Sequence, residues 1–134
     1  MLKQLSIYAE NKKGALQTMT NALYEAGINI WGSVTNDGAE YGINRMVVSD
    51  PDKAKEALTE KGYLCRFVDV LAVEIEDKPG ALNTLLTALL DSNVNVDYTY
   101  LSFNRDSSTP VMILHTADPE EVEICLRAKG FKMV

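Results

Sequence analysis

The sequence has few of the residues from which catalytic and metal sites are built. Its 134 residues include one histidine, His115, and two cysteines, Cys65 and Cys125, which lie far apart in the chain. This spacing excludes a CxxC redox motif and a cysteine-based metal cage, and one histidine alone supplies neither a triad nor a zinc site. A lone histidine at a strand end is more often a surface or hydrogen-bonded core residue than a catalytic base. We therefore expect no catalytic centre, no metal and two reduced thiols.

Long apolar runs and an excess of basic charge are also missing. The apolar runs are much shorter than a membrane span, and the first residues, MLKQ, begin no signal peptide. Lys and Arg number 13 against 19 Asp and Glu, a net charge of -6, whereas a nucleic-acid surface needs clustered basic residues. No GxGxxG or GxxxxGK[ST] segment is present. We therefore expect a cytoplasmic protein without cofactor that binds neither membrane nor nucleic acid.

A duplication organises the rest of the chain. Shifting the sequence by 66 residues places residues 5–30 on residues 71–96, with ten identities. Further along, a shift of 68 residues aligns Asp50-Pro51 with Asp118-Pro119. Two extra residues are easily tolerated in a hairpin loop, and we place them in residues 104–110. The sequence therefore predicts two modules in tandem, residues 1–69 and 70–134.

Each module repeats one order of strand and helix patterns. In the first module the predicted elements are residues 4–9, 16–26, 28–36, 43–48, 51–61 and 63–69. In the second they are residues 71–76, 81–92, 94–103, 111–116, 119–129 and 131–134. Gly27 and Gly62 mark helix ends, Asp37-Gly38 a turn, and Asp50 with Pro51 a helix start.

The order β-α-β-β-α-β predicts an α+β fold, with two ferredoxin-like βαββαβ modules whose antiparallel sheets carry both helices on one face. The last strand of the first module continues into the first strand of the second, because no Gly, Pro or Ser interrupts residues 67–73. We expect the modules to be held rigidly together, with strands shared or exchanged as open alternatives. Side-by-side pairing would also cover the bare sheet face and edges of a lone module.

The turn between the first strand and the first helix of each module is the candidate binding feature. It reads ENKKGAL at 10–16 and EDKPGAL at 76–82. Glycine allows close backbone approach, and the first N–H groups of the helix, together with its dipole, suit a carboxylate. Asp77 or an asparagine carbonyl oxygen can accept from an α-ammonium group. The same residues also suit a purely structural turn, and the sequence leaves both interpretations open.

These turns, together with AGINI at 26–30 and SNVNV at 92–96, resemble the ACT domain family, whose small βαββαβ modules bind amino acids and regulate metabolic enzymes. The resemblance covers essentially the whole chain, twice. It extends to stand-alone tandem ACT proteins without a catalytic domain, in YGINRMVV at 41–48 and DVLAV at 69–73. Lys13 replaces a proline of the family pattern and Asn93 replaces a glycine, which predicts that one of the two sites is looser or vacant.

The resemblance implies that an amino acid is bound between two ACT modules. The loop and helix start of one module and the beginning of the second strand of its neighbour would form the contacts. The implied ligand-binding residues are Asn11, Lys12, Gly14, Ala15, Leu16, Asn29, Ile30, Asp77, Pro79, Gly80, Ala81, Leu82, Asn95 and Val96. Asn29 and Asn95 also suit a turn between helix and strand. The aromatic residues Trp31, Tyr98 and Tyr100 suit either a pocket wall or a packed sheet face.

We therefore expect a non-catalytic, amino-acid-binding regulatory sensor that acts allosterically as a homodimer, with its ligand at an interface between ACT modules. The rival hypothesis is a regulatory subunit that docks on a metabolic enzyme and has a degenerate ligand pocket. A third, an enzyme built on this scaffold, is disfavoured because no nucleophile or general base is found. The sequence identifies neither the amino acid nor whether modules pair within one chain or between two.

Overall fold

The computed structural model describes residues 1–36 and 41–134, so the predicted turn at Asp37-Gly38 lies outside the described residues. Two compact units are found: a first unit, Lys3–Val68, and a second unit, Asp69–Val134 together with Met1–Leu2. The elements along the chain are β1 (Leu2–Glu10), α1 (Ala15–Glu25), β2 (Ile30–Asn36), β3 (Tyr41–Val48), α2 (Pro51–Glu60), β4 (Leu64–Glu74), α3 (Ala81–Asp91), β5 (Tyr98–Phe103), β6 (Pro110–His115) and α4 (Pro119–Ala128).

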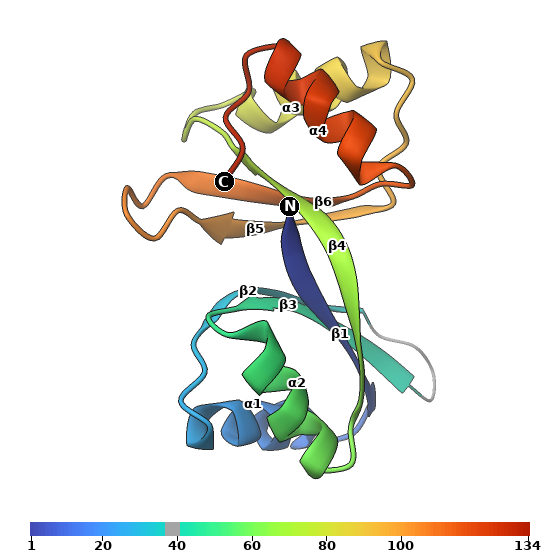
Figure 1. Cartoon of the computed structure of the whole chain (residues 1–134), viewed down its shortest axis with the longest axis vertical. Helices are drawn as coiled ribbons and strands as arrows, with labels where there is room; N and C mark the ends of the chain where they lie inside the picture. Colours follow the sequence, from blue (N-terminus) through green and yellow to red (C-terminus); the bar gives the residue numbers. More distant parts are fainter. Residues whose placement is uncertain (37–40) are drawn as a thin grey trace. The chain divides into compact units, whose positions relative to one another are not determined.

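The first unit is a sheet covered by α1 and α2 on one face (Figure 1). Its strands lie in the order β2-β3-β1-β4, and β3 is antiparallel to both β1 and β2. The two helices are amphipathic, and their apolar positions meet alternate residues of the strands in one buried core. This core comprises Leu5, Ile7, Met19, Ala22, Leu23, Ile28, Met46, Val48, Ala54, Leu58 and Cys65.

The second unit repeats this arrangement with α3 and α4 over its sheet (Figure 1). β6 lies between β4 and β5 and is antiparallel to both. The core comprises Leu71, Val73, Leu85, Leu89, Met112, Leu114, Val122, Leu126 and Met133. The α+β fold with two βαββαβ modules, predicted from the sequence, is therefore confirmed.

The helices α1, α2, α3 and α4 end in the same hydrogen-bonded motif. At the end of α1, the N–H of Gly27 donates to the carbonyl of Tyr24 and the N–H of Ile28 to that of Leu23, the two bonds of a Schellman motif. Gly27 has φ +73°, and Asn93, which replaces the corresponding glycine after α3, has φ +56°. Asparagine is one of the few residues that tolerate this left-handed conformation, so the replacement leaves the turn intact.

Several element boundaries differ from the sequence predictions. β5 begins at Tyr98 rather than at residue 94, because the bonds that close α3 occupy the N–H groups of Asn93 and Val94, and residues 94–97 precede the ladder with β6. Residues 131–134 form only a single bridge, from Met133 to Val73, rather than a strand.

β4 is one uninterrupted strand where the sequence predicted two consecutive strands. Its first part belongs to the first unit, and its second part, from Asp69, belongs to the second. Cys65 and Phe67 pack in the first core, whereas Leu71 and Val73 pack in the second. All four occupy alternate positions of the same strand, so a single alternation of side chains serves both cores.

Candidate functional site

The two candidate turns have the same conformation. Gly14 is the N-cap residue of α1, with φ 85° and ψ -4°, and Gly80 is that of α3, with φ 87° and ψ -8°. Within residues 1–36 and 41–134, α1, α3 and α4 start without a side-chain capping bond, whereas Asp50 caps α2 by accepting from the N–H of Lys53 at 3.2 Å. Lys13, where the second turn has Pro79, therefore does not change the conformation of the first turn.

The first N–H of each helix is not uncovered, which corrects one expectation from the sequence. The N–H of Ala15 donates to the carbonyl of Lys12 at 3.1 Å, and that of Ala81 to the carbonyl of Lys78 at 3.2 Å. Among the described residues, the next two donors of α1, the N–H groups of Leu16 and Gln17, meet no hydrogen-bond acceptor. These are the donors that an anion at this helix start would meet.

Glycine is needed at these turns because of its backbone conformation. A Cβ added at Gly14 or Gly80 would meet no heavy atom within 4 Å, so no crowding inside the chain excludes a side chain. The φ angles of +85° and +87° are instead those of the left-handed region, which costs a residue with a Cβ about 1–2 kcal/mol. The open space in front of each glycine is also where a ligand could approach the backbone.

A lysine and a glutamate form an ion pair at each turn. The Nζ of Lys12 lies 3.1 Å from Oε2 of Glu10, and the Nζ of Lys78 lies 2.7 Å from Oε2 of Glu76. All four side chains are mostly exposed, so each pair adds little to the stability of the fold.

The first turn opens onto a cavity of about 360 Å³. This volume lies in the range of small-molecule sites. Five of the predicted residues line it: Asn11, Lys12, Gly14, Ala15 and Leu16. The sequence did not identify the other lining residues, which are Ala9, Glu10, Gln17, Met19, Thr35, Gly42 and Asn44.

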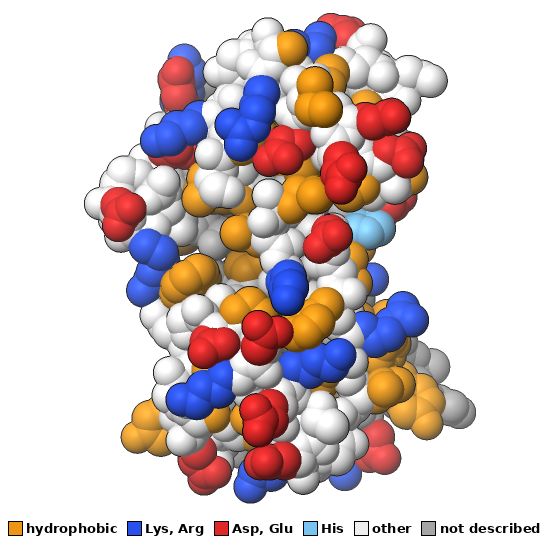
Figure 2. All heavy atoms as spheres, viewed as in Figure 1, with side chains coloured by type: hydrophobic (Ala, Val, Ile, Leu, Met, Phe, Trp, Pro, Cys, Tyr) orange, Lys and Arg blue, Asp and Glu red, His pale blue; other side chains and the backbone are white. Residues whose placement is uncertain are grey.

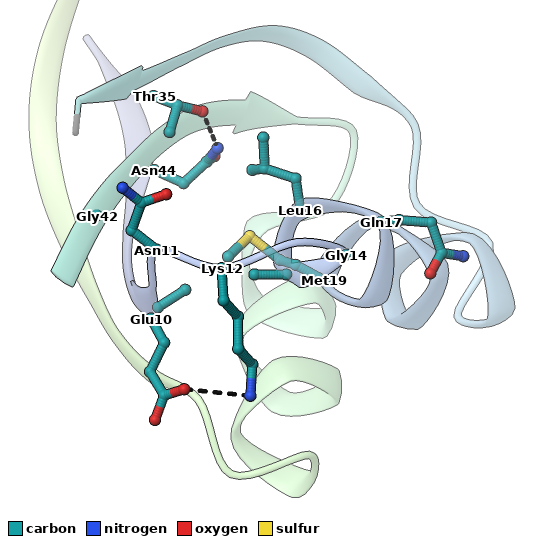
Figure 3. A pocket seen from close by; sticks show the side chains of 12 residues that line it. Glu10, Asn11, Lys12, Gly14, Leu16, Gln17, Met19, Thr35, Gly42 and Asn44 are labelled. Carbon is teal, nitrogen blue, oxygen red and sulfur yellow. Dashed lines mark hydrogen bonds and ion pairs between the residues drawn. The ribbon is translucent and has the colours of Figure 1, made fainter. Parts of the chain in front are cut away.

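Two polar side chains, those of Asn44 and Thr35, lie at one end of this cavity (Figure 3). Asn44 on β3 is only 3% exposed, and its Nδ2 donates to Oγ1 of Thr35 on β2 at 2.6 Å. The side chains of Asn11 and Leu16 extend toward Asn44, whereas the Lys12–Glu10 pair extends away from it (Figure 3). The cavity thus has a charged rim, the backbone donors of α1 and an amide at its inner end.

The second turn borders a cavity of about 420 Å³ on a different side of its unit. Lys78 and Ala81 line it together with Phe131, Lys132 and Glu74. Asp77, Pro79, Gly80 and Leu82 do not line this cavity and are exposed. In the second unit, therefore, only some of the predicted turn residues line the same cavity.

The predicted strand-start residues lie away from the turns. α1 has 11 residues, so about 16 Å of helix separates Gly14 from the segment that carries Asn29 and Ile30. Asn29 is exposed and Ile30 packs against the first core. In the second unit Asn95 lines a third cavity, of about 450 Å³, and Val96 packs against the second core. No single unit therefore brings its turn and its strand start into one cavity in the described part of the chain.

The remaining chemistry-bearing residues have structural partners. Nδ1 of His115 lies 2.8 Å from Oδ2 of Asp97, and the His115 ring stacks on Tyr98 with centroids 4.9 Å apart. Cys65 is buried, and burial raises the pKa of its thiol, an effect that the Lys55 charge partly opposes.

The surface carries both signs of charge. On the face shown in Figure 2, Lys and Arg side chains are interspersed with Asp and Glu. None of the helices within residues 1–36 and 41–134 combines the length and apolar character needed to cross a bilayer.

A pair of βαββαβ units, each with a glycine turn before its first helix, defines the class of tandem ferredoxin-like modules. The ACT domain pair family matches residues 1–133, and the chain belongs to this family. The resemblance inferred from the turns and strand starts is thereby confirmed.

Solved structures share the fold of this chain. Protein BT0572 from Bacteroides thetaiotaomicron is 31% identical, with a TM-score of 0.90, and the match covers 99% of this chain and 91% of that one. The ligand-free regulatory subunit of aspartate kinase from Thermus thermophilus is 18% identical, with a TM-score of 0.68 over 94% of this chain and 88% of that one. The corresponding subunit from Thermus flavus is 20% identical, with a TM-score of 0.62 over 96% and 91%. No curated protein matches the chain.

Proposed function

We propose that this chain is a non-catalytic regulatory protein that binds an amino acid at an interface between ACT modules. The observation that carries the proposal is the contrast between helix starts. α2 and α4 begin at the carboxylate-bearing residues Asp50 and Asp118, of which Asp50 caps its helix, whereas α1 and α3 begin at left-handed glycines that have no side chain with which to cap. At α1 this opening lies beside a cavity of about 360 Å³.

The chemistry of the first turn suits an amino-acid backbone. A ligand carboxylate would accept from the N–H groups of Leu16 and Gln17, where the helix dipole also favours negative charge. The α-ammonium group would donate to the side-chain oxygen of Asn11, or of Asp77 at the second turn. These contacts require no covalent chemistry, which agrees with a binding rather than a catalytic role.

The remaining predicted contacts, Asn29 and Asn95, support an interface between modules. Within a unit the length of α1 or α3 keeps these residues from the turn, so a ligand that meets both must meet a neighbouring module. That neighbour belongs to the same chain or, in the homodimer that we propose, to a second copy. The module boundary at 69/70, the homodimer and the cytoplasmic location stay predictions.

Regulation would follow from differential affinity. A ligand shared by two modules favours the arrangement of modules that completes its contacts, and it shifts the population only as far as its affinities for the two arrangements differ. A metabolic enzyme in contact with the chain would sense this shift, which fits the regulatory proteins that share the fold.

A thermal-shift screen of the twenty amino acids tests the proposal. A ligand at a hundredfold excess over its Kd should add about 2.7 kcal/mol, which for a chain of this length raises Tm by roughly 10 °C. Calorimetric titration of each amino acid that stabilises the chain then gives Kd and stoichiometry. Failure of every amino acid to stabilise or to bind would overturn the proposal.

One feature favours the rival hypothesis of a docking subunit with a degenerate pocket. Leu82, Leu86 and Leu90 lie four residues apart on α3, and their exposed fractions are 37%, 36% and 75%. Leucines at this spacing share one helix face. A chain that binds no amino acid, forms a stoichiometric complex with a metabolic enzyme and loses that complex with Leu86→Glu would identify the docking function instead.

A further inference from the structure

The amide at the inner end of the first cavity has a role that the proposed function does not assign. We infer that Asn44, held in place by Thr35, selects the side chain of the bound amino acid and favours an uncharged side chain that can form hydrogen bonds. The inference rests on the proposed function, since it assumes that the carboxylate of the ligand is bound at the start of α1.

The sheet register places Asn44 on the face covered by the helices. Ile7 on β1 and Thr35 on β2 lie directly opposite Asn44 on either side of β3. Directly opposed residues share a face of the sheet, and Ile7 belongs to the core beneath α1. Asn44 therefore continues an apolar row, and the cavity between this row and α1 ends at its carboxamide.

The second unit shows what this row looks like without the amide. There Met112 occupies the middle position, with Val73 and Leu101 opposite it. Met112 is buried in the second core, so an apolar side chain suits this position of the fold. Asn44 is thus not required by the βαββαβ architecture, and a buried amide is costly unless its hydrogen bonds are made.

The residues next to Asn44 are also smaller than those at the matching positions of the second unit. The next row of the first unit pairs Ala9 with Gly42, and both of these small residues line the cavity. In the second unit Ile75 and Pro110 occupy the corresponding positions, with the N–H of Ile75 donating to the carbonyl of Pro110 at 3.0 Å, and both are larger than their counterparts in the first unit. The first unit therefore combines a hydrogen-bonding side chain with room for a ligand.

The carboxamide of Asn44 can still form hydrogen bonds with a ligand. One N–H of Asn44 is used by Thr35 at 2.6 Å, and the carboxamide oxygen receives only a long contact, 3.5 Å, from Oγ of Ser33. A carboxamide has two N–H donors and two acceptor positions. With respect to the described residues, one donor and one acceptor thus remain, which match the amide or hydroxyl of a ligand side chain.

The position of the charged residues in the cavity disfavours a charged ligand side chain beside Asn44. Among the residues that the structure describes, the ionisable ones lining it are Glu10 and Lys12, which pair with each other and extend away from Asn44 (Figure 3). A carboxylate or ammonium group beside Asn44 would be desolvated without a counter-charge, which is unfavourable. Asparagine should therefore bind better than aspartate of the same shape.

Calorimetry with pairs of amino acids of similar shape tests the inference. The wild-type chain is titrated with threonine and valine, asparagine and leucine, glutamine and methionine, and aspartate. In at least one pair the polar member should bind on the order of tenfold more tightly, the effect of one or two hydrogen bonds. Asn44→Met, which copies the second unit, should reduce this ratio to about twofold or less.

Two further variants separate recognition from folding. Thr35 is exposed, so Thr35→Val should fold, and it should lower the polar preference because it removes the acceptor that orients Asn44. Met112→Leu alters the matching position of the second unit and should leave the preference unchanged. If the Tm of Asn44→Met lies far below that of the wild type, the inference is tested by the polar preference of Thr35→Val instead.

The outcomes distinguish this inference from the proposed function. A wild-type chain that binds no amino acid overturns both. A chain that binds amino acids but prefers the apolar or charged member, or that keeps its polar preference in Asn44→Met and Thr35→Val, overturns the selecting role of Asn44 alone.

Discussion

Gly14→Ala, compared with Gly27→Ala, separates a binding role of the first turn from a structural one. Both glycines are left-handed, with φ +85° and +73°, and at neither would a Cβ meet a heavy atom within 4 Å. Alanine in this conformation destabilises the folded state by about 1–2 kcal/mol, and the lower conformational entropy of the unfolded variant offsets part of this loss. Each variant should therefore lose about 1 kcal/mol, which lowers Tm by roughly 4 °C.

Binding should distinguish the two variants. Gly14 lines the cavity at the start of α1, whereas Gly27 follows the other end of the helix. A methyl group at Gly14 would stand where a carboxylate approaches the N–H groups of Leu16 and Gln17. Loss of these charge-assisted bonds, about 1.5–3 kcal/mol, would weaken binding at this site roughly 10- to 150-fold, with Gly27→Ala unchanged. Calorimetry with an amino acid that stabilises the wild type measures both variants.

Two results would refute this reasoning. If Gly27→Ala weakens binding as much as Gly14→Ala, general strain rather than the turn is responsible. If Gly14→Ala keeps the wild-type Kd and stoichiometry while its Tm falls as expected, the glycine serves only the turn and the carboxylate is not bound there.

Further variants test other parts of the structure. Gly80→Val should remove binding at the second turn and leave the first site intact, and an unchanged stoichiometry and Kd would count against this. Asn95→Ala should weaken binding while Tm changes little, because Asn95 is exposed; a large drop in Tm would assign it to structure. Asp50→Ala removes the bond to Lys53 and should cost about 1 kcal/mol in urea denaturation without altering Kd. Burial raises the pKa of the Cys65 thiol, so the contribution of this thiol to the free energy of unfolding is present below about pH 8.5 and is lost as the pH rises through the pKa of the folded state. In Cys65→Ala the free energy of unfolding should therefore fall less steeply over this pH range.

The fold was predictable because its signals are local and occur twice. Gly27 and Gly62 mark helix ends, and Asp50-Pro51 marks a helix start, through backbone preferences that act within a few residues. The repeat at 66 and 68 residues then showed each local pattern a second time. The start of β5 at Tyr98 was missed because residues 94–97, which precede the ladder with β6, have the same apolar alternation as a strand.

The cavity was only half predictable. Its turn residues, such as Asn11 and Gly14, follow from the strand-to-helix junction, which is contiguous in sequence. Asn44 and Thr35 reach the same cavity only through the register of β1, β3 and β2, which depends on pairing between distant segments. The difference between Asn44 and Met112 was visible in the repeat, but its meaning depends on knowing which face of the sheet these residues occupy.

β4 limits how a double module of this kind can vary in length. Cys65, Phe67, Leu71 and Val73 keep one alternation through the join, so an insertion of a single residue near Asp69 would turn one of the two sets away from its core. An insertion of two residues would preserve both sets. Related chains that differ in length at this join should therefore differ by even numbers of residues, and artificial arrays of such modules should be fused under the same parity rule.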